Sequence, residues 1–241
     1  MHTQVILVLF FCFLISACNS NDPEAETPVV VTVADQFADG ENHEWQAGFT
    51  DYPMGEDEFY ELASGVHELP EPLDGQGFML SGNNHSDDLM MYITKPVSGL
   101  VANTSYDVTF EVGFASNAGA GCFGIGGSPG ESVYVKSGAS IYQPVSAVRD
   151  SNHLRLNLDM GSQSSGGSDA VVIGNVASSE SCDGETYGTK TLDSAEHNFQ
   201  VLTDEVGQVW LIFAIDSGFE GITTIYITDV KVVLTPSGIV L

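Results

Sequence analysis

Basic side chains are scarce in this chain. Its 241 residues include six Lys and Arg against 33 Asp and Glu, which gives a formal net charge of −27. Proteins that bind DNA or RNA pair clusters of Lys and Arg with phosphates, so nucleic acid is excluded as a partner. The acidic residues are spread out rather than grouped, which predicts a solvated, self-repelling surface. Adaptation to saline surroundings is a second hypothesis for the same composition.

Long apolar runs are absent after the N-terminus. Only residues 5–15 form such a run, and they are too few to span a membrane as a helix, so they indicate an export signal. Residues 14–18, Leu-Ile-Ser-Ala-Cys, resemble the bacterial lipoprotein signal. The resemblance implies a signal peptide over 1–17, a lipid on Cys18 that anchors the protein in a membrane, and a polar tether over 18–28.

One departure from that signal keeps an alternative open. Residues 1–4 contain no Lys or Arg, so an ordinary secretory signal is the competing interpretation. Asn19 follows the cysteine, where these signals often carry an aspartate for inner-membrane retention, and this favours the outer membrane or cell surface. The chain without the signal has 224 residues (241 − 17), and we expect 29–241 to form one large domain with its own core.

The four cysteines divide by position. Cys12 leaves with the signal and Cys18 takes the lipid, so Cys122 and Cys182 remain in Gly- and Ser-rich segments. In an oxidising compartment this favours a disulfide between them. Two separate buried thiols are the alternative.

Segments with helical periodicity are also missing. Residues 106–114 alternate between apolar and polar side chains, which is the pattern of a half-buried strand. Residues 56–63 are ambiguous between one or two helical turns and a strand, and 36–53 are expected to be an ordered, wrapping loop. About ten short strands with no β–α alternation predict an all-β fold, a sandwich or barrel of antiparallel sheets. The other expected strands are 29–33, 77–81, 89–94, 133–135, 153–160, 170–174, 199–203, 209–216 and 223–234.

Two stretches carry a family resemblance. Leu100-x-x-Asn-Thr-x-Tyr-x-Val-x-Phe110 and residues 225–234 resemble strands of jelly-roll sandwiches related to carbohydrate-binding modules and galactose-binding-like domains. The whole exported part also resembles a set of uncharacterised bacterial lipoproteins, through residues 82–88, 124–132 and 216–221. The resemblance implies a jelly-roll β-sandwich of two antiparallel sheets.

Several short motifs match known catalytic or ligand-binding sites in sequence, but the neighbouring elements that such sites require are missing. Gly126-Gly-Ser128-Pro-Gly130 matches G-x-S-x-G, but Pro129 and a strand follow the serine where a nucleophile elbow needs a helix. Residues 119–124 match G-x-G-x-x-G, again without the helix that would face a pyrophosphate. The histidines have no zinc-ligand spacing.

Polar and aromatic side chains in loops provide the candidate sites. Asn84 and His85 lie in an amide-rich loop that could bind sugar hydroxyls, although turn conformation alone also explains its composition. Trp45 and Tyr52 could stack against sugar rings, or they could cover one face of the sandwich. Oxygen-rich loops make Ca²⁺ a possible cofactor. Its candidate ligands are Asp87, Asp88, Asp216 and Glu220.

Three functions fit these observations. The leading prediction is a non-catalytic exported lipoprotein whose sandwich binds glycan or another envelope or extracellular partner. The alternatives are a polysaccharide hydrolase or lyase on the same fold, with paired carboxylates in a cleft, and a structural envelope protein without a small ligand.

Overall fold

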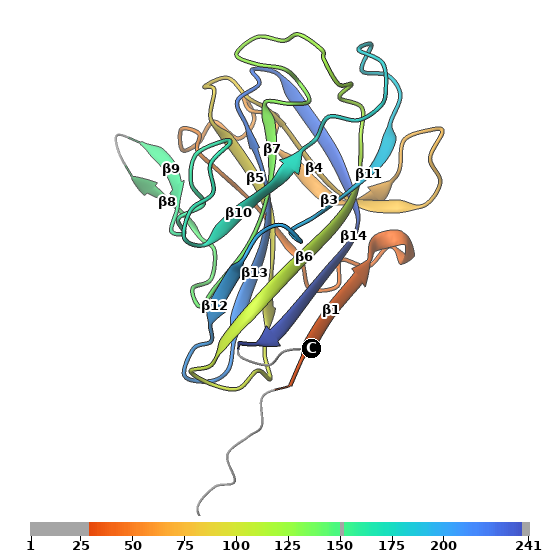
Figure 1. Cartoon of the computed structure of the whole chain (residues 1–241). Coiled ribbons are helices and arrows are strands. Elements are labelled where there is room, and N and C mark those ends of the chain that lie inside the picture. Colours follow the sequence, from red (N-terminus) through yellow and green to blue (C-terminus); the bar gives the residue numbers. More distant parts are fainter. Residues whose placement is uncertain (1–28, 150–151, 238–241) are drawn as a thin grey trace, which may run out of the picture.

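The computed structural model describes residues 29–149 and 152–237, which form strands and one short 3-10 helix, η1 (Phe37–Asp39) (Figure 1). The expected signal peptide (1–17) and the whole expected tether (18–28), which includes Cys18, lie outside the described residues. Among the described residues, no helix is long and apolar enough to cross a membrane. The strands are β1 (Val31–Gln36), β2 (Gln46–Thr50), β3 (Ala63–Glu68), β4 (Gln76–Asn83), β5 (Leu89–Val97), β6 (Ser105–Ser116), β7 (Val133–Ser140), β8 (Ser146–Arg149), β9 (His153–Leu156), β10 (Ala170–Asn175), β11 (Gly188–Asp193), β12 (Phe199–Leu202), β13 (Val209–Ser217) and β14 (Ile222–Pro236).

The strands build two large antiparallel sheets and a separate two-stranded sheet of β8 and β9. In the seven-stranded sheet, β6 and β14 are neighbours at the centre. The strands β11 and β12 pair with successive parts of β6, β4 and β1 pair with successive parts of β14, and β3 continues from β4. The five-stranded sheet has the order β10-β7-β13-β5-β2. The predicted all-β jelly-roll sandwich is therefore confirmed.

The alternating strand at 106–114 is the middle of β6 and supplies one wall of the core. Its five alternating apolar side chains are all buried, because every second residue faces the opposite sheet. From the opposite sheet, Met91 and Phe213 are buried in the same cluster, and Phe110 meets Phe213 edge-on with ring centroids 6.0 Å apart. The five residues of β6 are Tyr106, Val108, Phe110, Val112 and Phe114.

The outer face of the five-stranded sheet is covered. A β8–β9 hairpin lies beside the chain that follows β2, where the Asp51 N–H donates to the Leu154 carbonyl and the Leu154 N–H to the Tyr52 carbonyl. The segment after β9 then packs on the outer side chains of β5 and β13. This second apolar cluster consists of Met90, Tyr92, Leu158, Met160, Ala170, Ile212 and Ala214, with Leu156 packed against it.

Several expected elements differ from the structure. Residues 36–53 were expected as a loop but contain η1 and β2, and β3, β8 and β11 were not expected. The missed strands are half-exposed and rich in Ser, Thr, Gly and charged residues, so their apolar alternation is weak. Of the expected strand 153–160, only His153–Leu156 is a strand. Residues 56–62 form a turn whose buried side chain is Tyr60, while Phe59 points outward.

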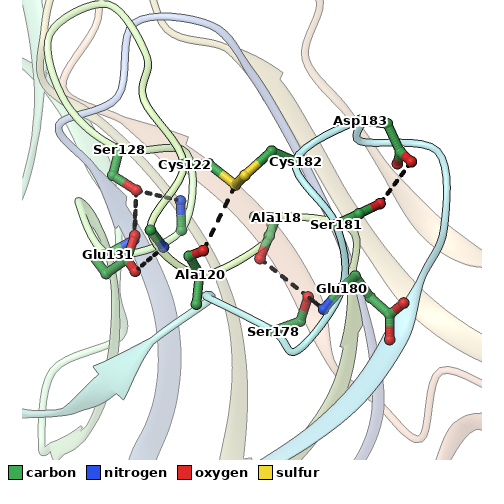
Figure 2. Close-up of a disulfide and its surroundings, with 12 residues drawn as sticks. Ala118, Ala120, Cys122, Ser128, Glu131, Ser178, Glu180, Ser181, Cys182 and Asp183 are labelled. Atoms are coloured by element: carbon green, nitrogen blue, oxygen red, sulfur yellow. Dashed lines mark hydrogen bonds between the residues drawn. A yellow bond between two sulfur atoms is a disulfide. The ribbon is translucent and has the colours of Figure 1, made fainter.

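The predicted disulfide between Cys122 and Cys182 is confirmed (Figure 2). It joins the glycine-rich loop between β6 and β7 to the loop between β10 and β11. The same two loops meet at a parallel bridge between Gly119 and Ser178, where the Ser178 N–H donates to the Ala118 carbonyl at 2.7 Å. The glycine loop is therefore held against its neighbour covalently and through its backbone.

Candidate functional site

A pocket of about 300 Å³ opens on the outer face of the five-stranded sheet, where β2 and β13 end and β5 begins. We call it the acidic pocket, because four aspartates line it and Arg155 is its one basic lining residue. Its lining residues are Asp51, Asp88, Met90, Arg155, Leu156, Leu158, Asp159, Met160, Gly161, Ser162 and Asp216.

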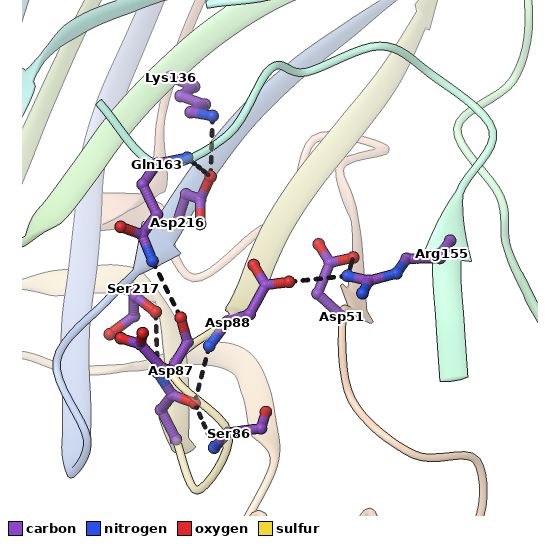
Figure 3. A network of polar contacts seen from close by, with 10 residues as sticks. Asp51, Ser86, Asp87, Asp88, Lys136, Arg155, Gln163, Asp216 and Ser217 are labelled. Carbon is purple, nitrogen blue, oxygen red and sulfur yellow. Dashed lines mark hydrogen bonds and ion pairs between the residues drawn. The ribbon is translucent and has the colours of Figure 1, made fainter. Parts of the chain in front are cut away.

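Arg155, on β9, links two of these carboxylates. Its Nη1 donates to Asp51 Oδ1 at 2.6 Å and to Asp88 Oδ2 at 2.7 Å (Figure 3). Asp51 directly follows β2 and Asp88 directly precedes β5, so one guanidinium fastens the hairpin to the ends of two strands. Its charge is satisfied by two carboxylates in a fixed geometry.

Asp51 is an unusual carboxylate. Burial raises the pKa of Asp51 from 3.8 to about 6, and the Asp88 and Asp216 charges add to this effect, while the hydrogen bond from Arg155 opposes it. Its backbone has φ of 67°, a left-handed conformation that aspartate and asparagine tolerate better than most residues. The backbone therefore turns sharply as the chain leaves β2.

Asp216, the penultimate residue of β13, forms a buried ion pair behind the pocket wall. Its Oδ2 lies 2.8 Å from Lys136 Nζ and also accepts the Gln163 N–H at 2.9 Å (Figure 3). Lys136 is fully buried and donates a second hydrogen bond to the Met160 carbonyl. Burial raises the pKa of Asp216, against the pull of Lys136.

The second oxygen of Asp216 is unsatisfied. The side chain is only 2% exposed, yet Oδ1 has no hydrogen-bond partner within residues 29–149 and 152–237. A buried carboxylate oxygen without a donor costs free energy on the order of 1–3 kcal/mol or more. Because Asp216 lines the acidic pocket, a ligand that donates a hydrogen bond there would remove this cost.

Asp159 supplies a fourth carboxylate from the segment after β9. It accepts the N–H groups of Ser168 at 3.0 Å and Gly161 at 3.2 Å. These hydrogen bonds, the one from Ser168 first, lower the pKa of Asp159. Asp159 is therefore a stable anion at the pocket mouth, unlike Asp51 and Asp216.

Apolar side chains complete the pocket. Met90 from β5 and Met160 from the covering segment are buried, and Leu158 lies beside them. Thioether and isobutyl groups offer surface to C–H groups without directional demands. The pocket thus combines several charged hydrogen-bonding groups with a smaller apolar wall, so it can contact both the polar groups and the C–H groups of a ligand.

Three of the expected ligand-binding residues have structural roles. Trp45 is 1% exposed, donates from Nε1 to Asp35 and packs on Phe213, so it offers no face for stacking. Tyr52 is buried, and its hydroxyl donates to Asp57 Oδ1 at 2.8 Å. The stacking role proposed for these two residues is therefore wrong, because both rings cover the sandwich.

Asn84 is likewise buried and fully engaged. Its Nδ2 donates to the carbonyls of Ser217 and Phe219, and its Oδ1 accepts from the N–H groups of Ser86 and Asp88. Asn84 therefore ties the β4–β5 loop to the β13–β14 loop. No amide atom remains to bind a ligand, which corrects that expectation.

His85 is exposed and stacks on an aromatic residue that the sequence did not single out. Its ring lies 4.1 Å from the Phe59 ring at 23°, and its Nε2–H donates to the Phe59 carbonyl. Phe59 is 58% exposed, and Tyr60 lies edge-on beneath His85 at 5.4 Å. The surface therefore displays an ordered pair of stacked rings, Phe59 and His85, and His85 lies three residues before Asp88 in the sequence.

The expected calcium ligands do not come together. Asp88 and Asp216 line the acidic pocket, whereas Asp87 and Glu220 do not; Glu220 lies beside Gly126 in the glycine loop. Across residues 29–149 and 152–237, no group of three or more Asp, Glu, His or Cys side chains is arranged to hold a metal ion. Calcium binding by these four residues as one set is therefore not supported.

The G-x-S-x-G serine is held by its own turn. Ser128 Oγ donates to Glu131 and accepts the N–H groups of Gly130 and Glu131 (Figure 2). Ser128 Oγ accepts the N–H three residues on, as in one half of a capping box, but the Ser128 N–H donates to Ser132 Oγ and β7 follows instead of a helix. A hydroxyl engaged in this way stabilises the turn, as expected from the missing helix.

Sequence patterns did not single out Asp51, Lys136 and Arg155. The one available signal was the scarcity of cations, because a lysine within the run Val133-Tyr-Val-Lys136 needs a buried anion. Which anion it meets depends on pairing between β7 and β13, which the sequence does not show.

Comparisons with known proteins find similar structures only. No protein-family model matches the chain, and no curated protein is similar to it in sequence. A carbohydrate-binding module, TmCBM61 in complex with beta-1,4-galactotriose, is 11% identical with a TM-score of 0.38, over 82% of this chain and 92% of its own. The xylan-binding module CBM15 is 12% identical with a TM-score of 0.38, over 87% of this chain and 99% of its own.

Part of a larger protein is also similar to this chain in structure. The enzymatically active domain of tailspike protein 4 from bacteriophage CBA120 is 9% identical with a TM-score of 0.35 over 80% of this chain. This chain spans 20% of the length of that tailspike chain. Because the sequence identities and TM-scores are this low, we infer nothing about a ligand from these matches.

Proposed function

We propose that this protein is a non-catalytic exported lipoprotein that is anchored through Cys18 and binds glycan in the acidic pocket. The observation that carries the proposal is the pocket itself, with an apolar wall facing fixed carboxylates and a guanidinium. Each sugar hydroxyl both donates and accepts a hydrogen bond. The Asp88 carboxylate can accept the hydrogen bond of a hydroxyl, and the neighbouring Arg155 guanidinium can donate one to it. Met90 and Leu158 can pack against ring C–H groups.

The position of the pocket supports a role at the surface. The chain enters the fold at β1, where Val31 pairs with Leu234 of β14, while Ile222 of the same strand pairs with Asn83 at the other end (Figure 1). Those twelve residues (234 − 222) correspond to roughly 40 Å along the strand. Because β4 ends and β5 begins at the far end, the pocket lies at the opposite end of the sandwich from the start of β1, which the proposed anchor would precede.

The aromatic pair Phe59–His85 extends the same end of the molecule. It is exposed, and the two rings hold each other in place. A preformed apolar face costs little conformational entropy when a sugar ring packs on it. A glycan longer than one residue could reach both features, because His85 and Asp88 belong to one loop.

A glycan array with the full chain in detergent tests the binding proposal. Arg155→Met removes the guanidinium from the pocket, and Arg149→Met on β8 is the matched control outside its lining. We expect at least tenfold weaker glycan binding for Arg155→Met and unchanged binding for Arg149→Met. Asp88→Asn is a milder second variant. Binding that survives both pocket changes, or no binding to any glycan by the parent chain, overturns the proposal.

Anchoring is tested separately. Replacement of Cys18 by Ser removes the residue that the lipoprotein signal would modify. We expect the protein to move from the membrane fraction to the soluble exported fraction. If the Cys18→Ser protein stays in the membrane, the lipid does not provide the anchor.

One observation favours glycan hydrolysis as a second candidate. Asp51 and Asp216 share the acidic pocket, and burial raises the pKa of both, as general acid catalysis by a carboxyl group requires. If this candidate is correct, a bound oligosaccharide is shortened over hours and Asp51→Asn stops the reaction. An unchanged oligosaccharide at saturating protein supports the non-catalytic proposal.

A further inference from the structure

The charges of the acidic pocket do not balance. Asp51, Asp88, Asp159 and Asp216 contribute four carboxylates, against Arg155 in the lining and Lys136 behind it. With all groups ionised the formal sum is −2. The surrounding protein reinforces the sign, because the whole chain carries −27. The pocket therefore repels anionic ligands such as uronates, sulfates and phosphates.

Both cations already pair with carboxylates, Arg155 through Nη1 alone. Arg155 contacts both Asp51 and Asp88, and Lys136 contacts Asp216 and the Met160 carbonyl. Asp216 Oδ1 lacks a hydrogen-bond donor in the described part of the chain. Asp159 accepts the backbone N–H groups of Gly161 and Ser168, which stabilise its negative charge, and it belongs to none of the ion pairs formed by the described residues. The acceptors left for a ligand are thus carboxylate oxygens.

A metal ion fits this donor set poorly. Ca²⁺ takes six to eight oxygen ligands, but three of the four pocket carboxylates are held by Arg155 or Lys136, and no metal-holding group occurs within 29–149 and 152–237. An ammonium group needs only three acceptors and carries the complementary charge. Met90, Leu158 and Met160 would lie against the carbon atoms that bear it.

We propose that the acidic pocket binds a saccharide with a free, protonated primary amine, because the unpartnered Asp216 carboxylate oxygen and the anionic Asp159 share one pocket with an apolar wall. The inference names the ligand class of the proposed glycan-binding function and rests on that function. The cavity of about 300 Å³ lies at the lower end of the range for small-molecule sites, which suits one sugar ring.

Three methyl glycosides that differ only at carbon 2 test the inference. They are methyl β-D-glucosaminide with a free amine, its N-acetyl derivative, and methyl β-D-glucoside. Their affinities for the full chain in detergent are measured by saturation-transfer NMR or calorimetry at pH 7. We expect the amine to bind at least tenfold more tightly than either neutral sugar. Its affinity should also fall as salt is raised, because the contact is ionic.

Single substitutions test which carboxylates produce the preference for the amine sugar. Asp159→Asn and Asp216→Asn each remove one carboxylate while keeping the shape of the side chain, and Asp107→Asn on β6 is a control outside the pocket lining. We expect the amine preference to fall to about twofold or less in Asp216→Asn and to fall partly in Asp159→Asn. It should stay unchanged in Asp107→Asn. Asp159 is exposed in a loop, so its variant gives a result even if Asp216→Asn does not fold.

The outcomes separate this inference from the proposed function. Neutral sugars that bind as tightly as the amine, with sensitivity to Arg155→Met, overturn the amine preference and leave glycan binding intact. Failure of glucosaminide, its derivatives and the array glycans to bind overturns both. If EDTA abolishes binding of the amine, a metal ion occupies the pocket and the inference is wrong.

Discussion

Replacement of Asp51 by Asn should change how the stability of the protein depends on pH. Asp51 is buried beside Arg155, and its pKa in the folded protein is about 6 against an ordinary value of 3.8. The folded state therefore holds a proton on Asp51 more tightly than the unfolded state does. Between these two pKa values the folded state binds more protons, so stability falls as pH rises.

The size of the effect follows from the same two values. A difference of about two pKa units corresponds to about 3 kcal/mol, since each unit is worth about 1.4 kcal/mol. The contribution is fully present below about pH 4 and is lost as pH rises through 6. Asparagine cannot ionise, so the Asp51→Asn variant lacks this loss while it retains a polar side chain of the same shape.

The measurement is urea denaturation of both chains at half-unit intervals from pH 4 to pH 8. The free energy of unfolding of the parent minus that of Asp51→Asn should fall by up to about 3 kcal/mol between pH 4 and pH 7. Subtraction removes the repulsion of the remaining acidic surface, which is nearly the same in both chains. Asp107→Asn, an exposed residue on β6, should show a much smaller dependence.

Two results would refute this reasoning. A difference that stays constant from pH 4 to pH 7 would mean that Asp51 titrates normally. A difference that rises with pH would mean that Arg155 outweighs burial and lowers the pKa of Asp51. Either result would also remove Asp51 from the hydrolase candidate, which needs a raised pKa.

Three further predictions concern stability, each read as the free energy of unfolding by denaturant. Replacement of both Cys122 and Cys182 by Ser should lower it by about 4 kcal/mol, because the bond closes a loop with a sequence separation of 60 residues; a loss below about 1 kcal/mol would contradict this estimate. Phe110→Ala should cost about 3–5 kcal/mol, whereas Leu202→Ala, at an exposed position, should cost about 0.5 kcal/mol or less. Gly207→Ala should cost more than Gly55→Ala: both have positive φ, but a Cβ at Gly207 would collide with the Leu100 carbonyl while Gly55 is open. Equal costs would show that the collision is relieved by a backbone movement.

Sequence alone predicted the parts of the fold in which one face of a strand is uniformly apolar. β6 is the clearest case, since Tyr106 and Phe114 belong to one unbroken alternation and all five side chains are buried. β3 and β11 were missed for the opposite reason. Both are edge strands of the seven-stranded sheet, and Gly188–Asp193 alternates only between intermediate and exposed residues.

The acidic pocket could be predicted only in fragments. Asp88 and Asp216 were selected because they lie in oxygen-rich loops, and the structure does bring both to the pocket. The sequence-based prediction assigned Asp88 and Asp216 to a calcium site because it could not show that each pairs with a basic side chain. Arg155 and Lys136 reach them only through long-range pairing, across sequence separations of 67 and 80 residues (155 − 88 and 216 − 136). No local pattern encodes such contacts.

Lys and Arg residues are scarce in this chain, and this scarcity explains why most of them contact carboxylates or backbone carbonyls. Of the six Lys and Arg residues, Lys95 and Arg155 pair with carboxylates, Lys136 is fully buried against Asp216, and Lys190 donates to the carbonyls of Asn175 and Ala177. A surface this acidic does not need cations for solubility. These four cations are instead placed where a carboxylate or backbone oxygen would otherwise lose its hydrogen bonds. Loss of one such cation should therefore be more damaging here than the loss of an exposed Lys or Arg usually is, because a buried anion would be left uncompensated.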